Sequence, residues 1–418
     1  MKRIRRRNPE APRHSSRIGR PESFTANVRP VRVLILSWEF PPSEAGGTAA
    51  HVDGLAHALS RLGHDVLVLT RRVPGAEADG MLGGVRVMRA DVELPWLPDN
   101  RVASTASANH ALVAAYAAAD ECRPDVIHAH DWPVAWAADV IAALTGAPIV
   151  TTFHGTERGR HGGHLKPGPS TDVNSVEWWQ AYRSRRMTAS TKLMVREVVD
   201  GFEVDPSHVT RIPSGIDPAW WRAAGPDEST VAGRSGLVLA WGRVQYEKGF
   251  QVLARAVGSL RYRIGGLECM IAGRGTYLPE LQSQVDVAGV GDIVELPGFV
   301  SDNELRAATH RAGCIVIPSL YEPFGIVALE ALASGAPLVV ADTGGLAELV
   351  GGTGSALLFE PGNAEQLADC IERVLTDQQL ADELVARGHE LIEATYSWDA
   401  IATRTLDVYA DAITAATG

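Results

Sequence analysis

The sequence predicts a two-domain α/β protein in which two doubly wound, Rossmann-like domains face each other across a central cleft. Three observations support this prediction. Short apolar runs alternate with stretches of helical periodicity along most of the 418 residues. The alternation occurs twice and lapses over residues 214–236, where Gly, Pro and polar residues prevail. Gly-rich or charged loops follow the predicted strands directly, at the edge where doubly wound sheets bind ligands.

The first domain opens with a strand–helix–strand unit. Val31–Leu36 is apolar at every position except Arg32, a pattern typical of a parallel strand buried on both faces. Apolar residues at helical spacing follow, and Gly63 stands where a helix C′ residue is expected, before the strand Asp65–Thr70. The other elements expected here are strands at Val85–Met88, Val126–His128 and Pro148–Thr152, and helices at Ser107–Ala119 and Pro133–Leu144.

The second domain repeats the pattern after the linker. Its predicted strands are Leu237–Trp241, Glu268–Ala272, Ile293–Leu296, Cys314–Ile317 and Leu338–Ala341. Helices fit between them, notably at Phe324–Ser334 and Ala364–Thr376, and the chain is helical from about residue 378. The expected parts are therefore a tail at 1–30, a first α/β domain at 31–213, a linker at 214–236, a second α/β domain at 237–395, and a helix at 396–418 that packs back on the first domain.

Charge and composition narrow the classes of function. The net charge is −11, although residues 1–30 carry nine Lys or Arg and only two Asp or Glu, so the rest of the chain is strongly acidic. No nucleic-acid partner is expected, because phosphate contacts need clustered basic charge. Residues 1–30 lack the apolar core of a secretory signal and are interpreted as a disordered tail. Four scattered cysteines and the lack of a long apolar run predict a cytoplasmic protein without a transmembrane segment. The oligomeric state stays open.

Two strand-to-helix loops of the first domain are candidates for ligand binding. Gly46 and Gly47 lie between a strand and a helix, where glycine admits a ligand close to the backbone and the helix N-terminus attracts anions. A simple tight turn is the alternative. His154 follows the strand at 148–152 and is placed to bind a sugar hydroxyl or to help a proton move. A structural loop histidine is the alternative there.

The second domain contributes charged loops. Arg243 and Lys248 follow its first strand, a combination that suits a diphosphate whose charge grows as it leaves. Glu322 is expected on a loop, and Glu330 lies in an otherwise apolar helix. A carboxylate there is costly unless it is paired or bound, so Glu330 either binds vicinal hydroxyls or forms a buried salt bridge. The loop at 344–345 repeats the anion-binding pattern at a helix start.

Taken together, these motifs resemble glycosyltransferase family 4. Residues 37–42, 128–132, 242–249 and 322–330 and the Gly-Gly-Leu loop at 344–346 occur in the family's order, and the likeness spans about residues 31–415. The run at 154–163 is similar to actinobacterial α-1,4-glucosyltransferases of glycogen or methylglucose-lipopolysaccharide synthesis. The resemblance implies a GT-B fold and a retaining hexosyltransferase. It implies that residues 31–213 form the acceptor-side domain and residues 237–395 the nucleotide-sugar-binding domain. It implies glucosyl transfer to an α-1,4-glucan or a related polysaccharide, with mannosyl or other hexosyl transfer as the alternative.

The resemblance also implies roles for single residues. Four residues would be catalytic. His154 would lie near O6 of the transferred sugar, Glu322 would contact that sugar, and Arg243 and Lys248 would bind the donor diphosphate. Glu330 would bind the ribose hydroxyls. The remaining donor contacts would be Gly46, Gly47, Phe324, Gly325, Ile326, Gly344 and Gly345, and the acceptor contacts Asp131, Arg158 and His161.

No cofactor is expected beyond the nucleotide-sugar substrate. Protein cations can neutralise the diphosphate and no suitably placed D-x-D cluster is present, so no metal is predicted. Glu44 and Ala45 stand where glycogen synthases that use ADP-glucose often carry a lysine, which favours UDP-glucose over ADP-glucose or a GDP-sugar. A metal-dependent hydrolase built on His128, His130 and Asp131 is an alternative, as are a glycosidase and a sugar-binding protein without activity.

Overall fold

The structure is a computed structural model that describes residues 29–42, 46–92, 100–119, 123–223 and 236–417. The chain divides into two units, residues 1–30 and Val31–Gly418, and the fold described below belongs to the second. Most of the predicted basic tail, Glu44, Ala45 and the larger part of the predicted linker lie outside the described residues.

The N-terminal half is built on an eight-stranded sheet with the order β3-β4-β2-β1-β5-β6-β7-β8. Neighbouring strands are parallel except for β3 and β4. The chain winds outward from β1 in both directions, so the sheet reverses its order between β1 and β5. The strands are β1 (Arg32–Ser37), β2 (Asp65–Arg71), β3 (Asp79–Leu82), β4 (Val85–Ala90), β5 (Val126–His130), β6 (Ile149–Phe153), β7 (Arg186–Ala189) and β8 (Val209–Arg211).

Helices cover this sheet, and the burial explains the sequence pattern. Every position of β5 and β6 is buried, so these strands lack the alternation of a half-exposed strand. These helices are α1 (Gly46–Arg61), α2 (Arg101–Ala118), α3 (Ala135–Thr145), α4 (Glu157–Arg160), α5 (Pro169–Arg183) and α6 (Lys192–Phe202). The short helix α7 (Pro218–Arg222) packs instead on the C-terminal half, where Trp221 is buried in the core. Among the described residues, no helix is both long and apolar enough to cross a membrane.

The C-terminal half contains a second, parallel six-stranded sheet with the order β11-β10-β9-β12-β13-β14. It reverses its order between β9 and β12. Its strands are β9 (Leu237–Trp241), β10 (Glu268–Ala272), β11 (Val294–Gly298), β12 (Cys314–Ile317), β13 (Leu338–Ala341) and β14 (Leu357–Phe359). Its helices are α8 (Phe250–Leu260), α9 (Leu278–Val287), α10 (Asp302–Arg311), α11 (Ile326–Ser334), α12 (Gly344–Val350), α13 (Ala364–Thr376) and α14 (Gln378–Thr395).

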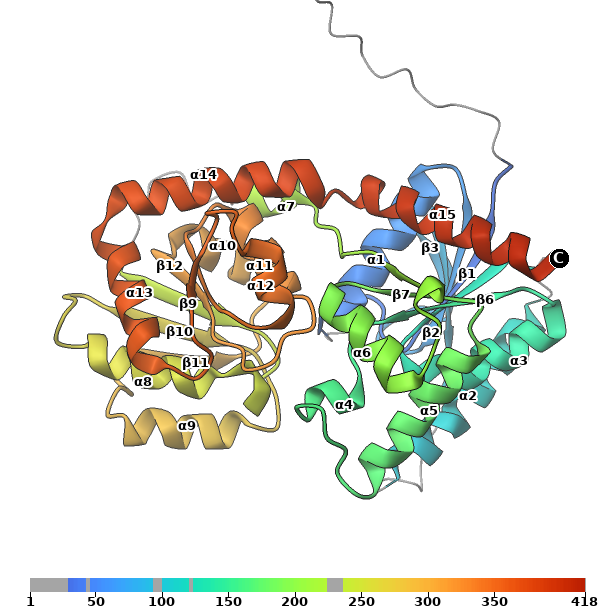
Figure 1. Cartoon of the computed structure of the whole chain (residues 1–418), viewed down its shortest axis with the longest axis horizontal. Coiled ribbons are helices and arrows are strands. Elements are labelled where there is room, and N and C mark those ends of the chain that lie inside the picture. Colours follow the sequence, from blue (N-terminus) through green and yellow to red (C-terminus); the bar gives the residue numbers. More distant parts are fainter. Residues whose placement is uncertain (1–28, 43–45, 93–99, 120–122, 224–235, 418) are drawn as a thin grey trace, which may run out of the picture. The chain divides into compact units, whose positions relative to one another are not determined.

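The last helix, α15 (Trp398–Thr417), returns to the N-terminal half and lies along α1 (Figure 1). Its residues Ile401, Ala402 and Tyr409 are fully buried in the apolar core that α1 and β1 share. The indole of Trp398 occupies the space beside Gly54 and Gly215, where an added Cβ would come within 2.1 Å and 2.6 Å of its ring. The C-terminal helix is therefore part of the N-terminal core.

The strands predicted at 237–241, 268–272, 314–317 and 338–341 agree with the structure residue by residue. One boundary prediction is wrong at a position that matters for the site. β5 continues through His130, two residues beyond the predicted strand end at His128. Asp131 instead has φ 59 and ψ 172, which breaks the strand abruptly before a short 3₁₀ turn at Trp132–Val134.

Candidate active site

A cavity of about 420 Å³ lies at the carboxyl ends of the central strands of both sheets. Its lining comes from the loops after β1, β5 and β6 on one side and after β9, β10 and β12 on the other. These loops flank the two points where strand order reverses, which is where doubly wound sheets bind ligands. The predicted site residues that line it are Gly47, Asp131, His154, Arg243, Lys248, Glu322, Phe324, Gly325, Ile326 and Glu330.

Lys248 and Glu322 form an ion pair in this cavity. The Lys248 Nζ atom lies 2.7 Å from Glu322 Oε2, and Glu322 is only 8% exposed. The loop of Lys248 packs against the loop of Glu322, because the carbonyl oxygen of Glu247 accepts the N–H of Leu320 at 2.8 Å. Gly249 (φ 69) allows this contact, since a Cβ there would lie 1.9 Å from the carbonyl oxygen of Pro318. The fold therefore positions the lysine beside the carboxylate.

Arg243 adds a second positive charge on the same side. Its side chain is exposed at the cavity and forms no hydrogen bond or ion pair with any residue in the described part of the chain. The N-terminal residues of α1 (Gly47, Thr48) and of α11 (Ile326, Val327) also line the cavity. Helix N-termini and unpaired guanidinium groups attract anions, so this region is suited to a phosphate-bearing ligand.

Glu330 lies in α11 at the far end of this region. The indole N–H of Trp241 donates a hydrogen bond to Glu330 Oε2 at 3.0 Å. Burial raises the pKa of Glu330 to about 7, the Trp241 hydrogen bond opposes this shift, and the charge of Asp302 adds to it. No lysine or arginine of the described segments pairs with this carboxylate, so the alternative of a buried salt bridge does not hold. The group is free to accept hydrogen bonds from a ligand.

Asp131, His154 and Arg160 border the cavity from the N-terminal half. Asp131 Oδ1 accepts the backbone N–H of His154 at 2.7 Å. Burial raises the pKa of Asp131 to about 6, and Arg160 opposes the rise, so the carboxyl is largely ionised at neutral pH. Burial, and then the charge of Arg160, lower the pKa of His154 to about 4, so its imidazole is neutral there.

Arg158 and His161, predicted as acceptor contacts, lie outside the lining of the cavity. Arg158 is exposed and does not line the cavity, whereas Arg160 does. Arg158 and Arg160 are two positions apart in the short helix α4, which places them about 200° apart around the helix axis. The two side chains therefore point in nearly opposite directions. His161 lies outside the lining and contacts Glu157 Oε1 at 3.2 Å. Sequence spacing alone does not show which of the two arginines in so short a helix faces the cavity.

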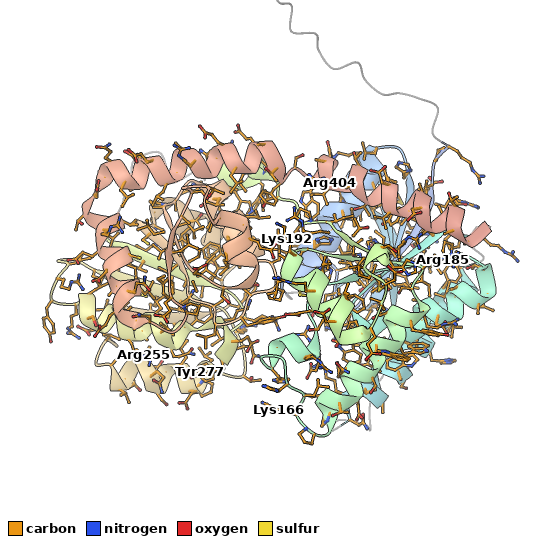
Figure 2. All side chains as sticks on the ribbon, in the orientation of Figure 1. Lys166, Arg185, Lys192, Arg255, Tyr277 and Arg404 are labelled. Carbon is orange, nitrogen blue, oxygen red and sulfur yellow. The ribbon has the colours of Figure 1, made fainter. Side chains whose placement is uncertain are left out.

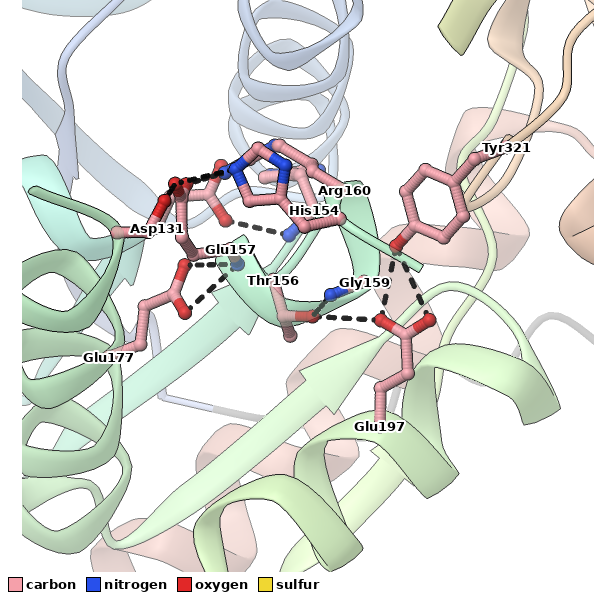
Figure 3. A network of polar contacts seen from close by, with 11 residues as sticks. Asp131, His154, Thr156, Glu157, Gly159, Arg160, Glu177, Glu197 and Tyr321 are labelled. Carbon is pink, nitrogen blue, oxygen red and sulfur yellow. Dashed lines mark hydrogen bonds and ion pairs between the residues drawn. The ribbon is translucent and has the colours of Figure 1, made fainter. Parts of the chain in front are cut away.

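A network of carboxylates surrounds Arg160 (Figure 3). Both oxygens of Glu177 accept the backbone N–H of Glu157 at 3.0 Å. Burial raises the pKa of Glu177 to about 8. Glu197 accepts the hydroxyls of Thr156 at 2.9 Å and Tyr321 at 3.1 Å. Because Tyr321 comes from the C-terminal half, this network also joins the two halves beside the cavity.

A second contact between the halves involves the N-terminus of α6, which begins at Lys192 (Figure 2). Glu348 of α12 accepts the backbone N–H groups of Lys192 and Leu193, each at 2.8 Å. The Thr191 hydroxyl donates to the carbonyl oxygen of Pro323 at 2.9 Å. A carboxylate at a helix N-terminus satisfies free N–H groups and interacts favourably with the helix dipole. Glu348 therefore holds α6 against the loop that carries Glu322.

Gly344 and Gly345, predicted as donor contacts, lie outside the cavity lining. They pack beneath the loop of Glu322: the N–H of Gly345 donates to the carbonyl oxygen of Glu322 at 2.8 Å. A Cβ at Gly345 would lie 2.3 Å from the Cα of Phe324. These glycines allow backbone-to-backbone packing and so position the loop that carries Glu322. Gly46 begins α1, and Gly47 is the member of that pair that lines the cavity.

Three histidines meet at the edge of the cavity. Nitrogen atoms of His51, His130 and His154 lie within 4.8 Å of one another, and His51 was missed by sequence reasoning. His130 Nδ1 and His154 Nε2 face each other in a 2.9 Å hydrogen bond. That bond occupies the lone pair that a metal ion would need, so the geometry does not favour a zinc site.

The His-x-His-Asp segment does not supply a ligand set either. The ring nitrogens of His128 are bonded to the Tyr409 hydroxyl and to Thr152 Oγ1, both at 2.7 Å. Asp131 Oδ1 bonds the His154 backbone. The arrangement gives no support to the metal-dependent hydrolase.

Two family models and several known proteins match the chain. The family model "Glycosyltransferase Family 4" matches residues 45–220, and "Glycosyl transferases group 1" matches residues 226–391. A relative named glycogen synthase, from Mycobacterium tuberculosis, is 35% identical over 393 residues, covering 91% of this chain and 94% of that protein. An α-maltose-1-phosphate synthase of the same species is 29% identical over 411 residues, covering 91% and 99%.

Solved structures show the same fold. Sucrose-phosphate synthase from Thermosynechococcus elongatus superposes with a TM-score of 0.78 at 22% identity, covering 92% of this chain and 99% of that one. The catalytic domain of starch synthase IV from Arabidopsis thaliana gives a TM-score of 0.73 at 17% identity, covering 92% and 100%. The predicted two-domain GT-B fold is confirmed. The chain belongs to glycosyltransferase family 4 and is a glycosyltransferase.

Proposed function

We propose that this glycosyltransferase moves a glucosyl unit, with retention of anomeric configuration, from a nucleotide-glucose to an α-glucan or a closely related acceptor. The relatives named glycogen synthase and α-maltose-1-phosphate synthase support the choice of sugar and acceptor. The observation that carries the proposal is the Lys248–Glu322 ion pair beside Arg243, in a cavity lined by both halves of the protein.

The chemistry follows from where the charges lie. As the bond between the sugar and the diphosphate breaks, negative charge grows on the leaving oxygen. Arg243, Lys248 and the N-termini of α1 and α11 line the region where that charge would develop. Preorganised groups of this kind are often the largest contribution to catalysis, and losing one costs roughly 10²–10³ in rate. Lys248 is oriented by Glu322, so the cation is already in place when the donor arrives.

The sugar would lie between the two halves. Glu322 from one side and His154 from the other would bind its hydroxyls, and Asp131 and Arg160 would border the acceptor. The acceptor hydroxyl would attack from the face that the diphosphate leaves, and its proton would pass to the leaving phosphate oxygen. This proposal requires no metal, because the protein cations balance the diphosphate.

The nucleoside would extend toward Glu330, whose free carboxylate oxygen suits the ribose hydroxyls. We propose UDP-glucose ahead of ADP-glucose or a GDP-sugar, on the strength of Glu44 and Ala45 in the sequence. These two residues lie outside the described part of the structure. The cytoplasmic location also stays a prediction.

A substrate panel tests the proposal. Purified protein is incubated with UDP-, ADP- and GDP-glucose, and with UDP-galactose and GDP-mannose. The acceptors are glycogen, maltooligosaccharides or glucose 1-phosphate, with and without EDTA. We expect rapid nucleotide release only with a glucose donor, an α-linked product by NMR, and no loss with EDTA. A preference for mannose or galactose, a β-linked product, or a requirement for added metal would overturn the respective part of the proposal.

A further inference from the structure

The histidine pair at the edge of the cavity has a defined proton arrangement. His130 Nδ1 and His154 Nε2 are 2.9 Å apart, and both side chains lie where burial lowers the imidazole pKa. Two neutral imidazoles that share one hydrogen bond need one donor and one acceptor. Either His130 Nδ1 carries the shared proton, or His154 Nε2 does.

The other ring nitrogen of His130 decides between these arrangements. His130 Nε2 is buried and has no hydrogen-bond partner within the described parts of the chain. If His154 donated, His130 would carry its proton on Nε2, and a buried N–H would have no acceptor. If His130 donates, only a lone pair is left without a partner. An orphaned buried N–H is the rarer and costlier case in proteins. His130 therefore donates through Nδ1.

We infer that His130 is a positioning residue that fixes the tautomer of His154, so that His154 presents an N–H at Nδ1 to the sugar in the cavity. His154 lines the cavity, whereas His130 lies behind it. In this form His154 donates a hydrogen bond to a sugar oxygen and cannot take a proton through Nδ1. The identity of that sugar rests on the proposed function, whereas the tautomer does not.

The surroundings hold His130 in place. Its ring packs between His51 and His128, with ring centroids at 5.6 Å and 4.2 Å. His128 is bonded to Tyr409 of α15, and His51 Nδ1 is bonded to Ser214 Oγ at 3.0 Å. The charged groups nearest His154 are Arg160 and Asp131, and Asp131 bonds its backbone rather than its ring. None of these contacts gives His130 Nε2 an acceptor.

Two substitutions separate the donor function of His130 from its bulk. His130→Asn can place an amide nitrogen near the position of Nδ1 and keep a donor. His130→Leu retains apolar volume but removes the donor. His110→Asn, at an exposed position of α2, is the matched control, and thermal denaturation shows whether each variant is folded.

The primary measurement is the ¹⁵N NMR spectrum of histidine-labelled protein without substrate. We expect His154 to be protonated at Nδ1 in the wild type and in His130→Asn, and to shift toward the Nε2 form in His130→Leu. The kcat of His130→Leu should fall about 10- to 100-fold with little change in the KM for the donor, as for other partners that orient a catalytic histidine. His130→Asn should recover most of this loss.

The inference is overturned if His154 of the wild type carries its proton on Nε2, or if folded His130→Leu keeps wild-type kcat. Stoichiometric zinc bound by the three histidines of the purified wild type would overturn it as well. The tautomer is measured without any donor, so a failure of the substrate panel would leave this result standing.

Discussion

Replacing Lys248 with methionine tests the central feature of the site. The change removes the charge and keeps most of the hydrocarbon chain. Turnover should fall about 10²–10³-fold, because one of the two side-chain cations expected on the leaving diphosphate is lost. Stability should fall too, because Glu322 would keep a buried carboxylate without its partner at 2.7 Å. Breaking a fully buried pair costs about 3–5 kcal/mol. Since the two side chains are 19% and 10% exposed, we expect about 1.5–3 kcal/mol.

A second variant separates catalysis from stability. In Lys248→Met/Glu322→Gln the unpaired charge is gone, so most of the lost stability should return while turnover stays low. Urea denaturation gives the free energy of unfolding, and nucleotide release gives kcat, for the two single variants and the double variant. The reasoning is wrong if Lys248→Met turns over at near wild-type rate, or if the double variant is no more stable than Lys248→Met.

Three further predictions follow from the same contacts. The wild-type kcat/KM for the donor should rise through about pH 7, because the Glu330 carboxyl ionises near that pH and binds ribose best as an acceptor. This rise should be absent from the pH-rate profile of Glu330→Gln. Glu177 keeps its proton to about pH 8 in the folded protein but loses it near 4.5 when unfolded, so wild-type stability should fall as pH rises between these values. Glu177→Gln should therefore gain stability over the wild type across that window and match it near pH 4, which melting curves at several pH values would show or refute. Glu348→Ala leaves two N–H groups of α6 without their acceptor, so the free energy of unfolding should fall by about 0.5–2 kcal/mol. The KM for the donor should rise more than kcat falls, and an unchanged KM would argue against a role of Glu348 in holding the halves together.

Much of the cavity lining from the C-terminal half could be predicted from the chain. Arg243, Lys248, Glu322 and Glu330 all line the cavity, because each belongs to a loop or helix that directly follows a recognisable strand. Parallel strands bring their carboxyl ends to one edge, so local patterns suffice to gather such residues.

The acceptor side and the supporting residues could not be predicted in this way. Choosing Arg160 over Arg158 depends on the rotation of a four-residue helix, and His51 reaches the site from α1, 79 residues before His130 in sequence. Gly345 contacts the backbone of the Glu322 loop rather than a ligand, a packing role that no local pattern distinguishes from a phosphate loop.

The sequence by itself determined the two doubly wound domains, the family and the two cations of the cavity, Arg243 and Lys248, because hydrophobic period and strand-end loops are local properties of the chain. Only the tertiary structure decided which partners those residues have. Lys248 pairs with Glu322, Glu330 accepts a hydrogen bond from an indole and meets no cation among the described residues, and His130 lies behind His154. Those contacts join residues far apart in sequence, and the packing of whole elements sets their distances.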